Sequence, residues 1–280
     1  MHTQTIRDRF WLWGMKVNAL QGTSDYAALN FGTSTLTVEQ AIQRTGARNV
    51  IMAGLLPIAQ ESLDAMPSAE RIICKWSMHK GADGKNVMNY DGCLSRLMAA
   101  KELAADDTRI EGFLVDDFST GSIEAGVGPE HLRRMQYENA VHGPHLPLGA
   151  TIYTMSLERP ELSGLLPFFA QFLVPLWHAD QIATLPASVD RLSELSGGKP
   201  MLLCLYVFDF GENKPISREG MQRQLDVAER LLHEGKVTGL VVCGTCMMDL
   251  DWEANHCLYE WLDRVGDRKI EGGRHDCTAK

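Results

Sequence analysis

Two adjacent aspartates end one of the most apolar segments of the chain. In Gly112-Phe-Leu-Val-Asp-Asp-Phe118, a run typical of a buried strand stops at Asp116 and Asp117. Neighbouring strand residues point to opposite faces, so we expect one carboxylate to face an opening and the other to hold a neighbouring segment. Buried like charges are costly, which favours a catalytic role for Asp117 and a positioning role for Asp116. The alternative is that both only bond nearby loop backbone.

A third aspartate, Asp209, follows the apolar run 201–208. Alternation along this run places Asp209 on one face with Leu205 and Val207, so we expect it to reach the same opening as Asp117. Two carboxylates that face each other across an opening are what glycoside cleavage needs, one as the acid and the other as the nucleophile or base. The alternative is that Asp209 is a turn residue.

Aromatic and cationic side chains also fall at or near the ends of the apolar runs. Flat aromatic faces bury the apolar face of a sugar ring while its hydroxyls bond polar neighbours. Core packing explains any single tryptophan more simply, but their coincidence with carboxylates favours a sugar site. The predicted substrate-binding residues are Trp11, Trp13, Lys75, Trp76, Tyr153, Trp177, His178 and Trp252.

Two of these residues support a different chemistry. A barrel lyase or isomerase acting on a sugar or sugar acid would use Lys75, His178 or a divalent metal for the proton transfers. No HxH or HExxH spacing supports a metal site, and Cys243-Gly-Thr-Cys246 has no second cysteine pair to complete a zinc site. We therefore predict no metal and no cofactor. A third hypothesis is a sugar-binding protein without catalysis, with only one carboxylate at the opening.

The elements that must position these side chains repeat along the chain. Short apolar runs alternate with amphipathic segments, and eight such units are typical of an α/β protein whose parallel strands close into a (β/α)8 TIM barrel. The rival is an open doubly wound sheet, but no Gly-rich phosphate turn follows the first run. The predicted strands are 10–14, 49–54, 71–76, 110–116, 148–154, 172–177, 201–208 and 238–244.

Start signals locate several of the helices between these runs. Thr37-Val-Glu-Gln40 is a capping box that predicts a helix through Thr45. Pro129 suits a first helical turn, and Ser217 caps a strongly amphipathic segment. For the 280 residues we predict a single barrel domain over 1–267 and a charged C-terminal tail over 268–280.

Composition limits the classes of partner. With a formal net charge of −9, the protein lacks the basic surface of a nucleic-acid-binding protein. The same negative charge argues against binding to anionic membrane surfaces. No apolar segment is long enough for a membrane span or suggests a signal peptide, and an odd number of cysteines in apolar runs is typical of reduced thiols. We expect a cytoplasmic protein with a small-molecule carbohydrate substrate, a neutral or cationic sugar rather than a phosphorylated one. The oligomeric state is not predicted.

Several motifs carry a resemblance to a known group. They are Phe10-Trp-Leu-Trp-Gly14, the Asp116-Asp117 segment, Leu205-Tyr-Val-Phe-Asp-Phe-Gly211 and Gly239-Leu-Val-Val-Cys-Gly-Thr-Cys246. With these motifs, most of the chain resembles uncharacterised bacterial barrel proteins that are generally regarded as glycoside-hydrolase-like. The resemblance implies a (β/α)8 fold and carbohydrate chemistry. Position by position, it singles out Asp116, Asp117 and Asp209.

Overall fold

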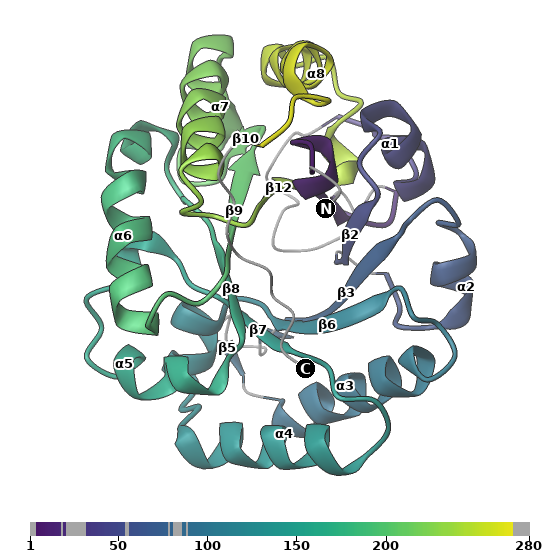
Figure 1. Cartoon of the computed structure of the whole chain (residues 1–280), viewed down its shortest axis with the longest axis vertical. Coiled ribbons are helices and arrows are strands. Elements are labelled where there is room, and N and C mark those ends of the chain that lie inside the picture. Colours follow the sequence, from purple (N-terminus) through teal and green to yellow (C-terminus); the bar gives the residue numbers. More distant parts are fainter. Residues whose placement is uncertain are drawn as a thin grey trace.

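The computed structural model describes residues 4–17, 19–20, 32–53, 56–77, 79–80, 86–87 and 89–270. Its centre is a closed barrel of parallel strands, and helices surround that barrel as an outer ring (Figure 1). The predicted (β/α)8 TIM barrel is confirmed.

The barrel strands follow the order of the chain around the ring, and the last pairs again with the first. They are β1 (Phe10–Gly14), β2 (Asn49–Met52), β3 (Arg71–Trp76), β6 (Ile110–Val115), β7 (Leu148–Thr151), β8 (Gln171–Val174), β9 (Met201–Tyr206) and β12 (Gly239–Cys243). Strands β1, β2, β7 and β9 are buried along their whole length, because helices cover the outer face of the barrel. The predicted runs begin close to the observed strands, but β2, β7, β8 and β9 end two or more residues earlier than expected.

Helices connect successive barrel strands. They are α1 (Val38–Thr45), α2 (Gln60–Asp64), α3 (Tyr90–Ala104), α4 (Pro129–Val141), α5 (Leu162–Leu165), α6 (Leu185–Ser196), α7 (Arg218–His233) and α8 (Glu253–Val265). Two small hairpins also follow barrel strands. They are β4 (His79–Lys80) with β5 (Asn86–Val87), and β10 (Phe208–Asp209) with β11 (Lys214–Pro215).

The predicted helix starts are confirmed by their hydrogen bonds. The Thr37 hydroxyl accepts from the Gln40 backbone N–H at 3.2 Å, and the Gln40 side chain accepts from the Thr37 backbone N–H at 2.9 Å. Pro129 is the first residue of α4, and the Ser217 hydroxyl accepts from the Gly220 N–H at the start of α7. These local bonds satisfy N–H groups that have no partner inside the helix.

The two described ends of the chain lie against each other. The backbone N–H of Ile6 donates to the Arg268 carbonyl at 3.1 Å, and the Ile270 N–H donates to the Gln4 carbonyl at 3.0 Å. Residues 271–280 of the predicted tail lie outside the described residues, so the domain boundary at 267 stays a prediction. Among the helices of the described ranges, none is both long and apolar enough to cross a membrane.

Candidate active site

A cavity of about 540 Å³ opens at the carboxyl ends of the barrel strands. Every barrel strand, or the loop that follows it, contributes lining residues. TIM-barrel enzymes have their active sites at this end, and pockets for small ligands measure roughly 300–1,000 Å³. The cavity therefore has the position and size of a small-molecule site.

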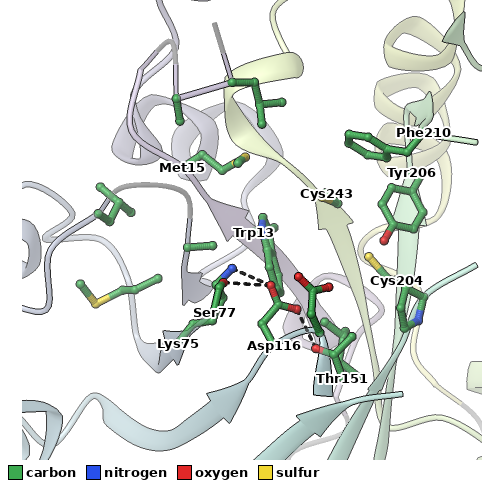
Figure 2. A pocket seen from close by; sticks show the side chains of 18 of the residues that line it. Trp13, Met15, Lys75, Ser77, Asp116, Thr151, Cys204, Tyr206, Phe210 and Cys243 are labelled. Carbon is green, nitrogen blue, oxygen red and sulfur yellow. Dashed lines mark hydrogen bonds and ion pairs between the residues drawn. The ribbon is translucent and has the colours of Figure 1, made fainter. Parts of the chain in front are cut away.

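Asp116 is the most firmly held side chain of the cavity. Lys75 Nζ donates to its Oδ2 at 2.6 Å, and the Ser77 hydroxyl donates to the same oxygen at 3.2 Å. The Thr151 hydroxyl donates to Oδ1 at 2.8 Å from the other side, as Figure 2 shows. The Lys75 and Asp116 side chains are only 12% and 11% exposed, so this ion pair is largely shielded from water. Both oxygens of Asp116 thus have fixed donors, and its charge is balanced by Lys75.

Asp117 reaches the same cavity through a change in backbone direction. Strand β6 ends at Val115, and Asp117 has φ 51°, in the left-handed region that Asp tolerates better than most residues. The Tyr153 hydroxyl donates to Asp117 Oδ1 at 2.7 Å. The expectation that only one of the two adjacent aspartates faces the opening was therefore wrong. Strand alternation no longer applies at position 117, and both carboxylates line the cavity.

Aromatic rings form a wall of the cavity on the β7–β9 side. Tyr153 and Trp177 meet edge to face with ring centroids 5.8 Å apart, and Trp177 stacks on Phe210 at 5.6 Å. Tyr206, at the end of β9, contacts Phe210 at 5.5 Å. Burial raises the pKa of Tyr206 well above its usual range, so its hydroxyl stays protonated and available as a donor near neutral pH. The wall offers flat apolar faces together with a hydroxyl donor.

Asp209 does not line the cavity, contrary to the sequence prediction. Strand β9 ends at Tyr206, and it is Cys204 and Tyr206 that line the opening, so the alternate positions face the helices. Asp209 belongs to the β10 hairpin. Its Oδ2 accepts from the Ala179 N–H and its Oδ1 from the Glu212 N–H, both at 2.9 Å. This is the turn-residue alternative, and the geometry favours a structural role for Asp209.

We expect Asp209→Asn to lower stability without abolishing turnover. The amide N–H2 would face a backbone N–H where an oxygen now accepts, at a cost of about 1–3 kcal/mol in the free energy of unfolding. On a responsive glycoside, kcat should stay within roughly tenfold of the parent protein. Asp180→Asn, at an exposed position nearby, is the matched control for denaturation and kinetics. A loss of kcat comparable to that of an acid/base variant, with unchanged stability, would restore the catalytic role of Asp209.

Two of the predicted tryptophans lie away from the cavity. Trp11 is on the same strand face as Trp13 but one layer deeper in the barrel, under the Arg71 guanidinium at 4.8 Å from its ring centroid. Trp76 follows the cavity residue Lys75, so it faces the helices and is buried there. Both are core residues, and Trp13 is the tryptophan of the first strand that reaches the cavity.

Two further predicted substrate-binding residues pack in the loops around the opening. Trp252 lies at the start of α8 with its ring 5.5 Å from that of Phe208. His178 lies against Gly211, where a Cβ would come within 2.1 Å of the imidazole, so the close approach requires glycine. Neither Trp252 nor His178 lines the cavity. Of the predicted binding residues, Trp13, Lys75, Tyr153 and Trp177 do.

Sequence reasoning missed several cavity residues. Thr151 had a detectable signal, because a polar residue at the end of a fully buried strand indicates an inward-facing position. No such signal marks Cys204, Tyr206 or Cys243, because both faces of their strands are apolar. Arg96 comes from helix α3 rather than from a strand end, so the strand-end rule does not reach it.

The cavity thiol Cys243 is not poised as a nucleophile. A hydrogen bond with Cys204 and burial raise the pKa of the Cys243 thiol well above its usual range. The thiolate is the reactive species, so we expect iodoacetamide at pH 8 to label Cys243 in the folded protein at least about tenfold more slowly than in urea. Peptide mass spectrometry over time measures both rates. Rapid labelling of Cys243 in the folded protein would contradict this assignment.

Metal-ligating side chains do not cluster in the part of the chain that the structure describes. No group of three or more His, Cys, Asp or Glu side chains is placed there to hold a metal ion. The described cysteines are free thiols, and all but Cys243 are buried. The expectation that the protein needs no metal or cofactor stays a prediction.

Comparison with known proteins finds solved structures with a similar fold and no relative by sequence. No protein-family model and no curated protein sequence matches the chain. The chain is similar to the glycoside hydrolase domain of PgaB (BpsB) from Bordetella bronchiseptica, with a TM-score of 0.54 and 12% identity over 93% of this chain and 99% of that chain. It is also similar to a chitinase from Chromobacterium violaceum, with a TM-score of 0.51 and 11% identity over 89% of this chain and 98% of that chain. At this identity the likeness shows a shared fold, and membership of the bacterial group stays a prediction.

Proposed function

We propose that the protein hydrolyses an O-glycosidic bond, with Asp117 as the acid/base and Asp116 as a fixed carboxylate beside the reacting carbon. The observation that carries this proposal is the arrangement at the end of β6. Both carboxylates line one cavity, and the ring of Trp177 forms part of the wall of that cavity. The solved structures with a similar fold include proteins named as a glycoside hydrolase domain and a chitinase, which supports the same class of reaction.

The two carboxylates have different roles because their hydrogen-bond partners differ. Glycoside cleavage passes through a transition state with positive charge on the sugar ring, and the oriented negative charge of Asp116 stabilises it. Asp117 donates a proton to the leaving oxygen as the bond to the anomeric carbon breaks. A water molecule then attacks that carbon and gives its proton back to Asp117, which restores the acid.

Each neighbour has a role in this scheme. Lys75, Ser77 and Thr151 hold the Asp116 oxygens in place, so the negative charge needs no reorganisation during the reaction. The Tyr153 hydroxyl orients the Asp117 carboxyl group. One face of the Trp177 ring packs on Phe210, and a sugar ring can stack on the face that Phe210 does not cover.

A sugar-binding barrel without catalysis is the second candidate. The observation that favours it is the position of Asp209, which leaves the cavity without the opposite carboxylate that the sequence predicted. The lyase or isomerase hypothesis has less support. Lys75 is ion-paired with Asp116, and His178 lies outside the cavity lining.

A panel of 4-nitrophenyl glycosides tests the proposal. We expect release of nitrophenol from at least one member, with saturation kinetics. Binding of sugars measured by calorimetry, without release from any glycoside of the panel, would support the sugar-binding candidate instead.

A further inference from the structure

The cavity contains a guanidinium group that the proposed chemistry does not use. Arg96, on the first half of α3, lines the cavity. Its Nη2 donates to the Leu56 carbonyl at 3.5 Å, the outer limit of a hydrogen bond. Its Nε is buried and has no hydrogen-bond partner among the residues that the structure describes. In the described part of the chain, no carboxylate pairs with Arg96.

Other shielded cations in the described chain have oxygen acceptors for their donors, and two of them are paired with a carboxylate. Lys75 is paired with Asp116, and Arg109 donates to both oxygens of Asp107 with distances of 2.6–3.0 Å. A guanidinium group has five N–H donors, and a buried N–H without an acceptor costs about 1–3 kcal/mol. Arg96 therefore carries unused donor capacity at the wall of an open cavity.

The balance of charges in the cavity is consistent with an anionic ligand. Lys75 and Asp116 neutralise each other, which leaves Arg96 and Asp117 as the other charged groups of the described lining. Within the described lining, Arg96 is the cation that has no carboxylate partner. A ligand that brings one negative charge to this side of the cavity would supply that partner.

The position of Arg96 separates this contact from the reacting bond. Arg96 and its neighbour Leu56 follow β3 and β2, whereas Asp117 and Tyr153 follow β6 and β7. In the barrel, β3 and β6 carry the Lys75–Asp116 pair, and they lie between β7 and β2, whose following loop Arg96 contacts through Leu56. An anionic group on Arg96 would thus anchor the substrate from one side while the glycosidic oxygen lies at Asp117.

We infer that Arg96 binds an oxyanion substituent, so that the substrate is an acidic sugar carrying a carboxylate or sulfate group. A guanidinium matches either group with two parallel hydrogen bonds. The identity of the ligand as a sugar rests on the proposed function. The inference replaces the sequence-based expectation of a neutral or cationic sugar.

Calorimetry with free monosaccharides tests this inference without any turnover. The probes are matched pairs: glucuronate with glucose, galacturonate with galactose, and glucose 6-sulfate with glucose. We expect the parent protein to bind at least one acidic sugar roughly tenfold or more tightly than its neutral partner, as charge-assisted hydrogen bonds provide. Arg96→Gln should remove this preference and leave the affinity for the neutral sugar unchanged. The carboxylate and sulfate arms show which oxyanion fits.

The controls separate this inference from the proposed function. Arg133→Gln, at an exposed position on α4, removes the same charge far from the cavity and should keep the acidic preference. An acidic preference that depends on Arg96, without hydrolysis of any glycoside, would contradict the hydrolase proposal and leave this inference standing. Equal affinity within every pair, a preference that survives Arg96→Gln, or no binding of any probe would overturn it.

Discussion

Asp117→Asn is expected to lower kcat on a responsive glycoside by about 10³-fold, within the 10²–10⁴ range of general acid–base catalysis. An amide cannot donate the proton that the leaving oxygen needs. The fold should persist, because asparagine also tolerates the left-handed backbone at this position and its carbonyl can accept from Tyr153. Steady-state kinetics and a thermal melt measure both effects, and Tm should stay within about 2 °C.

Asp180→Asn is the matched control for Asp117→Asn. It makes the same chemical change at an exposed position after β8 and should leave kcat and Tm unchanged. If Asp117→Asn retained full activity, Asp117 would have no part in the reaction, and the assignment of the acid would be wrong.

Lys75→Met is expected to cost about 3–5 kcal/mol in the free energy of unfolding. The substitution leaves the Asp116 carboxylate in a largely shielded position with two hydroxyl donors but no counter-charge. The double variant Lys75→Met/Asp116→Asn should be less destabilised than Lys75→Met alone, because it contains no uncompensated charge. Urea denaturation of the parent protein, both single variants and the double variant measures the coupling between the two side chains.

Lys16→Met removes an exposed lysine near the end of β1 and is the control for this experiment. It should change the free energy of unfolding by less than about 0.5 kcal/mol. If Lys75→Met cost less than about 1 kcal/mol, the Lys75–Asp116 pair would behave like an exposed surface ion pair, and the fixed charge assigned to Asp116 would lose its support.

The fold was largely predictable because its signals are local and repeated. The strand 10–14, the strand 71–76 and the helix that Thr37 caps coincide with the observed β1, β3 and α1. Strand ends were harder to predict. In the runs that end at Thr154 and Trp177, the residues after β7 and β8 are still apolar although the chain has left the barrel. An apolar run indicates that residues are buried, not that they form a strand. Loop residues over the barrel mouth are also buried, so they were predicted as part of the strands.

The site was only partly predictable because the inward face of a buried strand has no compositional signature. Along β9 both faces are apolar, so placing Asp209 on the inward face was an even choice, and the inward residues are Cys204 and Tyr206. The left-handed turn at Asp117 was equally hidden, since any Asp-Asp pair is compatible with an extended strand. The order of residues along the chain does not predict a left-handed turn of this kind. Its presence became clear from the three-dimensional structure.

The most direct test of the account is a crystal structure of the Asp117→Asn variant with an intact glycoside that the parent protein hydrolyses. We predict that the glycosidic oxygen lies about 3 Å from the side chain at position 117, as proton transfer requires, with a sugar ring on the face of Trp177. A glycoside bound outside the β6 end of the cavity, or one whose glycosidic oxygen is held by Asp209, would contradict the central claim that the adjacent carboxylates after β6 perform the chemistry.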